Sequence, residues 1–288
     1  MTPASLLLRT WLLARLPAEA AAWLDESGER VRGPDGERAL YLRIGQVPRR
    51  LGHLPLQLDA AELAAASATR AGWEPRDWTV DQAARLWLML ETSPNDAVAF
   101  ARRLEQLCAT GEVGELVAFY RGLPLYPAPE RHAGRCAEGV RSNMRVVFEA
   151  VAHRNPYPAE QLPEGAWNQM VLKALFVGCD LQPIVGLDAR RNPALAGMLR
   201  DYAHERWAAS RSISPELWRC VGPYATGATL ADFERLLERG SPDERAAAVL
   251  ALAESPDPGA TSLLERDVAL LAAMRAGRLS WHHLATST

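Results

Sequence analysis

The chain contains a single lysine, Lys173, among 32 basic residues, so every other side-chain cation of this class is an arginine. An arginine guanidinium stays protonated, whereas a lysine ammonium is a compact charge that can lose its proton when it is removed from water. A desolvated lysine can act as a base, as a nucleophile that forms an imine, or as the partner of a ligand phosphate. Chance retention of one lysine codon is the plain alternative.

The residues around Lys173 predict a helix inside a helical bundle. On a helix from Pro163 to Val177, apolar side chains surround nearly the whole circumference, while Gln169 and Lys173 share one stripe four residues apart. We therefore expect Lys173 to be partly desolvated and to face a ligand together with Gln169. A lysine that pairs with a carboxylate, or that reaches the surface near the helix end, has a structural role instead.

Amide side chains concentrate in the same part of the chain. Residues 143–192 hold four of the five asparagines, in a stretch with irregular turns fixed by proline. Amides make specific hydrogen bonds, and such turns often carry sites on helical scaffolds. We therefore expect Asn155, Tyr157 and Asn168 to shape a cavity around Lys173. Asn168 is the weaker member, because on an ideal helix it points away from Lys173, towards a role in capping a neighbouring turn.

A second candidate is Arg206, which lies on the apolar face of a helix expected over 193–209. A buried guanidinium needs a partner, either a protein carboxylate or an anionic ligand group held by two hydrogen bonds. Asp188 and Glu205 are the internal candidates for that partner. We include these three residues, with Asp201 on the same helix, among the expected ligand-binding residues.

A metal site is the third chemical possibility. Glu149 and His153 lie four residues apart on one expected helix, and Asp201 and His204 lie on one side of another, so two facing helices could supply a histidine–carboxylate site. The segment HERWA at 204–208 lacks the second histidine of H-E-x-x-H, however, and a solvated charged face explains these residues equally well. We expect neither a metal nor a cofactor.

Common catalytic signatures are absent from the sequence. It contains no Gly-rich phosphate loop, no G-x-S-x-G elbow and no paired acidic motif of the isoprenoid-synthase kind. Lysine-centred sites need none of these motifs. The sequence is therefore compatible both with an enzyme and with a binding protein.

Helix starts recur along the chain and predict an all-α fold. Strand evidence is confined to 39–47, and one such run cannot form a sheet by itself. We expect an irregular array of antiparallel helix pairs, with a short extended or irregular insertion near 39–50. Five segments place a capping Ser or Thr before a helical run: TVDQ at 79–82, SPND at 93–96, SPEL at 214–217, TLAD at 229–232 and SPDE at 241–244.

The Ala/Leu-rich run at 241–274 predicts two helices separated by a Pro/Asp turn, which is typical of one HEAT-like pair. We expect a single domain over residues 1–288 whose part from about 212 onwards is HEAT-like. The apolar N-terminal segment is interrupted by Arg9 and Arg15, so it indicates an amphipathic first helix rather than a signal peptide.

The composition is that of a soluble globular protein. Hydrophobic residues make up 48% of the chain, charged residues 23%, and the net charge is -3, so there is no basic field for nucleic acid and no segment for membrane insertion. The four cysteines form no Cys-x-x-Cys motif and are expected to be reduced, buried thiols. The expected compartment is the cytoplasm.

Longer runs of sequence resemble a known family. The segments NMRVVFEAVAHRNPYPAEQLPEGAWNQMVLKALFVG and IVGLDARRNPALAGMLRDYAHERWAASRSISPELWR closely resemble the EboA family, and WTVDQAARLWLML and YLRIGQVPRRLG fit the same pattern. The resemblance extends from about residue 40 to about residue 225.

The resemblance implies a context rather than a reaction. EboA-like proteins are encoded in bacterial gene clusters beside a UbiA-type membrane prenyltransferase and other enzymes, which implies a pathway that makes or exports a prenylated or cyclitol-derived metabolite. We expect a cytoplasmic accessory protein that binds a small intermediate or a partner enzyme, such as the prenyltransferase or another protein of the cluster. A metal-independent enzyme centred on Lys173 is the alternative. The family offers no catalytic residues to carry over.

Overall fold

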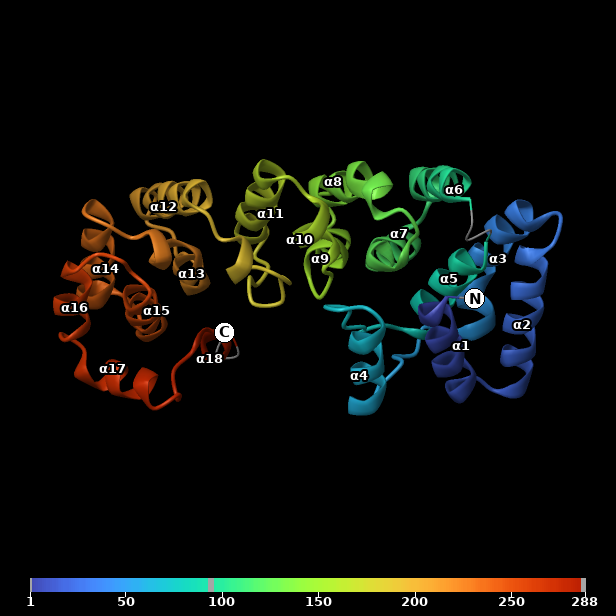
Figure 1. Cartoon of the computed structure of the whole chain (residues 1–288), viewed down its shortest axis with the longest axis horizontal. Helices are drawn as coiled ribbons and strands as arrows, with labels where there is room; N and C mark the ends of the chain where they lie inside the picture. The colour runs from blue at the N-terminus through green and yellow to red at the C-terminus, as the bar shows by residue number, and fades with distance from the viewer. Residues whose placement is uncertain (1, 93–95, 286–288) are drawn as a thin grey trace. The chain divides into compact units, whose positions relative to one another are not determined.

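The protein is all-α, as the sequence predicts. The computed structural model describes residues 2–92 and 96–285, and within these ranges it contains eighteen α-helices, five short 3-10 helices and no β-strand (Figure 1). By their internal contacts the residues divide into two compact units, Met1–Leu162 and Pro163–Thr288.

The first unit is built around one buried helix, α5, which packs against α1, α2, α3 and α7. A Cβ atom on Gly28 of α2 would lie 2.3 Å from the Trp87 ring of α5, so a glycine is needed for these two helices to approach this closely. The helices of the unit are α1 (Pro3–Arg15), α2 (Ala18–Arg32), α3 (Gly36–Leu51), α4 (Ala60–Thr69), α5 (Val80–Glu91), α6 (Ala97–Thr110), α7 (Val113–Arg121), η1 (Leu123–Leu125), η2 (Pro129–His132), α8 (Ala133–Arg141), α9 (Arg145–Ala152) and α10 (Tyr157–Gln161).

The segment 39–50, which the sequence suggested to be extended or irregular, lies within helix α3. Leu40, Ile44 and Val47 are buried along one helical face, whereas Leu42 is 59% exposed. The prediction was wrong because apolar residues two apart and four apart coincide in such a short run, so both the strand period and the helix period fit it. In the folded protein the residues with helical spacing are the buried ones, as in an amphipathic helix.

The apolar N-terminal segment 5–24, expected as one amphipathic helix, is helical but is divided at Leu16 and Pro17 between α1 and α2. Leu8 and Leu12 are buried on one side of α1, while Arg9 forms an ion pair with Asp25 of α2 at 2.9 Å. None of the helices that the structure describes is both long enough and apolar enough to cross a membrane.

The second unit is built around α15, whose residues from Ala246 to Leu252 are all buried. This helix packs against α13, α14, α16, α17 and α18. The helices of the unit are α11 (Glu164–Phe176), η3 (Asp188–Arg190), α12 (Pro193–Ala208), η4 (Pro215–Leu217), α13 (Trp218–Val221), η5 (Gly222–Tyr224), α14 (Ala228–Arg239), α15 (Pro242–Ala253), α16 (Gly259–Leu264), α17 (Val268–Arg275) and α18 (Trp281–Ala285).

The C-terminal Ala/Leu-rich run forms one long and two short helices instead of two helices. Its first part is α15, but the second part breaks between α16 and α17, where the side chain of Asp267 accepts a hydrogen bond from the Leu270 amide at 3.0 Å and begins a new helix. A HEAT-like repeat in this region stays a prediction.

Two of the expected helix starts carry the predicted capping boxes, at Thr79 for α5 and at Ser241 for α15. Ser214 precedes the 3-10 helix η4 without a capping hydrogen bond from its side chain. The cap expected at Thr229 was wrong, because the N-cap of α14 is Gly227, two residues earlier, where a φ of 51° favours glycine. Positions 93–95 of the SPND motif lie outside the described residues.

Candidate functional site

A cavity of about 510 Å³ lies within the second unit. Its wall comes from the end of α11 and the residues after it, the later turns of α12, the segment 212–216, the first turn of α15, and Leu284 of α18. Leu175, Ile213, Pro215 and Leu284 supply apolar surface, and the remaining wall is largely polar. The volume of this cavity lies within the range of small-molecule sites, although its wall is more polar than is usual for them.

Arg206 lies on the wall of this cavity, so one residue expected from the sequence is part of it. Its partner is neither Asp188 nor Glu205, because Nε and Nη2 donate to the Ser212 carbonyl oxygen at 3.0 and 2.8 Å. The contact fixes the guanidinium against the segment after α12. A carbonyl oxygen replaces the expected carboxylate because the chain turns back on itself directly after α12, which places that backbone within reach.

Tyr202 and Ser214 contribute hydroxyl groups that have no hydrogen-bond partner among the described residues. Tyr202 is only 7% exposed, and its ring contacts that of Phe176 with a centroid distance of 4.7 Å. The residue Tyr202 is buried as a whole, whereas Ser214 is only partly buried. Both groups can serve as donors or acceptors for a bound molecule.

The first turn of α15 places two carboxylates on the cavity wall, Asp243 and Glu244. Glu244 takes part in the capping box, in which it accepts from the Ser241 amide at 2.8 Å and its own amide donates to the Ser241 hydroxyl at 3.2 Å. Asp243 has no ion pair or side-chain hydrogen bond among the described residues. It is half-buried, so its carboxylate is one that a ligand can use.

A third carboxylate of the cavity wall, that of Glu216, binds the backbone of the segment after α11. It is buried and accepts hydrogen bonds from the amides of Leu181 and Gln182 at 2.7 and 2.8 Å. Burial raises the pKa of Glu216 above its ordinary value, and the two amide donors act against that rise. Its oxygens are thus used to position the loop that carries Asp180, a fourth acidic residue of the wall.

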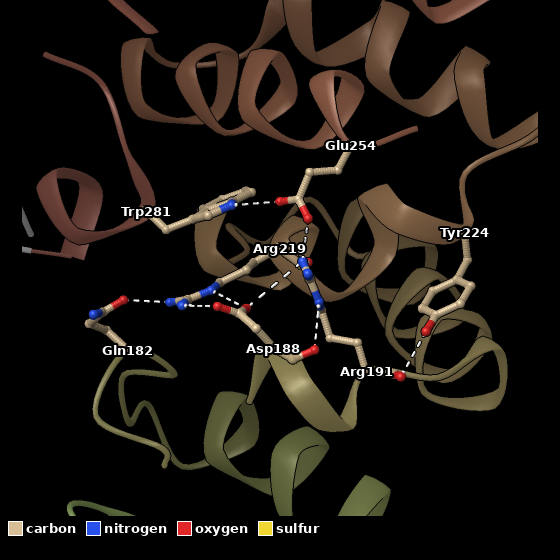
Figure 2. Close-up of polar contacts among 7 residues, drawn as sticks. All are labelled: Gln182, Asp188, Arg191, Arg219, Tyr224, Glu254 and Trp281. Carbon is tan, nitrogen blue, oxygen red and sulfur yellow. Dashed lines mark hydrogen bonds and ion pairs between the residues drawn. The ribbon is translucent and has the colours of Figure 1, made fainter. Parts of the chain in front are cut away.

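Asp188 belongs to an ion-pair network elsewhere in the second unit (Figure 2). Its carboxylate binds the Arg219 guanidinium through two hydrogen bonds of 2.7 Å each. Arg191 donates to Glu254 at 2.6 Å, and Trp281 donates to the other oxygen of Glu254 at 3.2 Å. Burial tends to raise the pKa of Asp188, but Arg219 and then Arg191 outweigh it and hold that pKa below its ordinary value.

The network connects the loop before α12 with α13, the C-terminal end of α15, and α18. Gln182 accepts from Arg219, and the Tyr224 hydroxyl donates to the Arg191 carbonyl at 2.7 Å (Figure 2). The carboxylates of Asp188 and Glu254 balance the charges of the Arg219 and Arg191 guanidinium groups. The Asp188 carboxylate is therefore paired within the protein, with Arg219, and not with Arg206 as the sequence suggested.

The residues expected around Lys173 have different environments. Lys173 is half-buried on α11, and burial lowers its pKa from the ordinary value, as the sequence suggested. Gln169 is exposed. Asn168 forms reciprocal amide hydrogen bonds of 3.1 and 2.9 Å with Asn192, which caps α12. Neither Lys173 nor its two expected neighbours are among the described residues that line the cavity.

Asn155 and Tyr157 lie in the first unit, where they have internal partners. The Asn155 amide nitrogen donates to the carbonyls of Tyr120 and Ala150 at 3.0 and 3.1 Å, and its oxygen accepts from the Tyr157 amide at 3.1 Å. The Tyr157 hydroxyl donates to the Pro129 carbonyl. These hydrogen bonds fix the NPYP turn, so both residues have a structural role in the first unit.

The four residues considered for a metal are divided between the two units. Glu149 accepts from Arg145 at 2.7 Å, and His153 lies at the C-terminal end of α9. His204 lies 2.8 Å from an Asp232 oxygen, while Asp201 is exposed, as is Glu205. In the part of the chain that the structure describes, no group of three or more His, Cys, Asp or Glu side chains is arranged to hold a metal ion.

Tyr202, Ser214 and Asp243 line the cavity but were not predicted from the sequence as site residues. Tyr202 precedes Arg206 by one helical turn on the same face, which is the signal that could have linked them. Ser214 and Asp243 belong to the two motifs SPEL and SPDE, which were interpreted only as helix starts. Both motifs contribute to the cavity wall.

Comparison with known proteins identifies the family. The model of the family described as metabolite traffic protein EboA matches residues 4–222 of the 288-residue chain. Neither a curated protein nor a solved structure matches the chain. The matched range includes the part of the cavity wall from Leu175 to Glu216 and ends before the first turn of α15. With about three quarters of its length matched, the chain belongs to the EboA family.

Proposed function

We propose that the protein is a non-catalytic accessory protein of a metabolite traffic pathway, which binds a small and partly polar intermediate in the cavity of its second unit. The family description supports a role in metabolite traffic. A prenylated or cyclitol-derived intermediate, and transfer to a partner such as the UbiA-type prenyltransferase, are parts of the same proposal. The proposed compartment is the cytoplasm, where the chain's thiols would stay reduced.

One observation carries the proposal. Tyr202, Ser214 and Asp243 line one cavity, and each has a polar group without a partner among the described residues. These groups are accessible from the cavity and make no contact within the described chain, so a bound metabolite with polar groups would pair them. The apolar part of the wall would bury the carbon skeleton of the same molecule.

The cavity also argues against a self-sufficient enzyme. The described wall of the cavity contains no histidine and no lysine, two of the side chains that catalysis uses most often as acids, bases or nucleophiles. A carboxylate could still act as a base. The wall therefore favours binding through hydrogen bonds over proton transfer at neutral pH.

The test is to measure how much ligand stays bound through purification. The protein is isolated from cells that express the whole gene cluster, and native mass spectrometry reports the bound fraction. Tyr202→Phe removes only the unpaired hydroxyl, so it should weaken ligand binding about fivefold, as expected for one lost hydrogen bond. The melting temperature should stay nearly unchanged, since the hydroxyl has no internal partner.

The matched control is Tyr41→Phe, which removes a hydroxyl that donates to Gln106 on the first unit at 2.7 Å. It should leave the bound fraction at the wild-type level. Equal losses in both variants, or no ligand in the wild-type protein, would contradict the proposal.

The second candidate function is an enzyme centred on Lys173. The observation that favours it is the lowered pKa that burial gives to this lysine, because a deprotonated amine is a base and a nucleophile. Incubation of the purified protein alone with candidate substrates separates the two candidates. Turnover without any other protein of the cluster would support the enzyme and exclude a purely accessory role.

A further inference from the structure

We infer that Asp243 makes the cavity selective for a hydroxylated small molecule that carries a protonated amine. The inference rests on the proposed function, because it assigns a chemical class to the molecule that the cavity binds. It also assigns a specificity-determining role to a residue beyond the part of the chain that the family model matches.

The cavity wall carries more negative than positive side chains. Four carboxylates, those of Asp180, Glu216, Asp243 and Glu244, face a single guanidinium, that of Arg206. Two nitrogens of that guanidinium already donate to the Ser212 carbonyl. An anionic ligand would meet an excess of negative charge in a partly desolvated space, where like charges repel more strongly than in water. The wall therefore disfavours phosphates and carboxylates.

One of the four carboxylates remains for a ligand. Glu216 is occupied by two backbone amides, and Glu244 by the Ser241 amide. Asp180 has an interaction of its own within the chain. Asp243 alone among the four has no partner in the described part of the chain. A cation bound there would satisfy it by a charge-assisted hydrogen bond.

A second and independent group points to the same occupant. Tyr202 is 7% exposed, lines the same cavity, and has a hydroxyl without a partner among the described residues. The Ser214 hydroxyl is a third unpaired group on the wall. A hydroxyl group both donates and accepts hydrogen bonds, so an occupant that carries hydroxyl groups as well as an amine would pair with all three residues.

The position of Asp243 is well fixed, as a specificity residue requires. The helix that carries it, α15, is buried along most of its length and begins with the Ser241–Glu244 capping box. At its other end, Glu254 binds Arg191 and Trp281 (Figure 2). The first turn of a helix also favours a negative charge, which keeps an aspartate suitable at this place.

The experiment compares three probes with the same sugar ring and different charge: glucosamine, N-acetylglucosamine and glucosamine 6-phosphate. Isothermal titration is carried out on the full chain, with EDTA present to exclude binding through a metal ion, at a pH where the glucosamine amine is protonated. Wild-type protein should bind glucosamine about tenfold more tightly than N-acetylglucosamine, as expected for one hydrogen bond between charged groups. It should bind the phosphate more weakly than glucosamine.

Asp243→Asn should reduce the preference for glucosamine to within about threefold, because the amide offers a hydrogen bond without the charge. Glu265→Gln is the matched control, since Glu265 is an exposed carboxylate of the same unit outside the cavity wall, and it should keep the wild-type preference. If Asp243→Asn lowers the melting temperature strongly, Asp243→Ser is used in its place and should reduce the preference for glucosamine in the same way.

A wild-type protein that does not bind glucosamine, or that binds all three probes equally, overturns the inference. So does an Asp243→Asn variant with the wild-type preference. In the wild-type protein, raising the pH above the pKa of the glucosamine amine should also remove the preference, and this comparison needs no variant. The proposed function is tested separately by the ligand that stays bound through purification, so the inference can fail while that function stands.

Discussion

Three side chains, Tyr202, Ser214 and Asp243, connect the structure to its proposed function, because they are polar, line one cavity, and have no partner among the described residues. The sequence could not reveal this property. It shows residue types, whereas the presence or absence of a partner depends on how helices far apart in the chain are folded together. Asp188 and Asn168 illustrate the converse, since both were expected to bind a ligand and both have partners within the second unit.

Lys173 gives a prediction at the same scale. It is half-buried and does not line the described cavity, so Lys173→Arg should leave ligand occupancy within about twofold of wild type, and Lys173→Met should do the same. Native mass spectrometry and melting temperature are measured together for both variants.

Pathway output in the Lys173 variants separates the two candidate functions. If Lys173→Arg abolishes the product while the fold and the bound ligand are retained, the lysine-centred enzyme is supported, because the planar guanidinium cannot replace a compact ammonium. Unfolding of both variants would instead assign Lys173 a structural role.

At the scale of elements, the helices were largely predictable and their ends less so. Capping boxes at Thr79 and Ser241 marked the starts of α5 and α15 correctly, because a cap is a local feature with a local sequence signature. The segment that became α3 was misjudged, since a short apolar run fits two periods until burial chooses between them. The break between α16 and α17 was also missed, although Asp267 is a capping residue.

The ion-pair network of Asp188 predicts how stability depends on pH. Because the folded-state pKa of Asp188 lies below its ordinary value of 3.8, its contribution is fully present above that value and is lost as the pH falls through the lower folded-state pKa. Asp188→Asn should therefore cost about 1 kcal/mol of unfolding free energy at neutral pH, a figure reduced for solvent exposure. The difference from wild type should shrink in acid.

Urea unfolding at several pH values measures this dependence. Asp201→Asn, which removes an exposed carboxylate of the same unit, should differ little from wild type at any pH. A constant difference between Asp188→Asn and wild type down to strongly acidic pH would mean that the ion pair with Arg219 contributes nothing through its charge.

At the scale of the whole molecule, the sequence predicted the all-α class and the family, and both are confirmed. Both follow from features spread along the chain, such as recurrent helix starts and long family-like segments. A single domain over residues 1–288 stays a prediction, and contacts divide the chain into two compact units. The cavity lies within one of these units, with walls from residues inside and outside the family match.

The central claim is that the second unit binds a metabolite in the cavity lined by Tyr202, Ser214 and Asp243. A crystal structure of the protein purified with its bound ligand, from cells that express the whole gene cluster, tests it most directly. The account predicts ligand density in this cavity, with polar ligand atoms within hydrogen-bond distance of the Tyr202 hydroxyl and the Asp243 carboxylate. Density for the ligand at another place, such as beside Lys173, with only water in the cavity, would contradict the account.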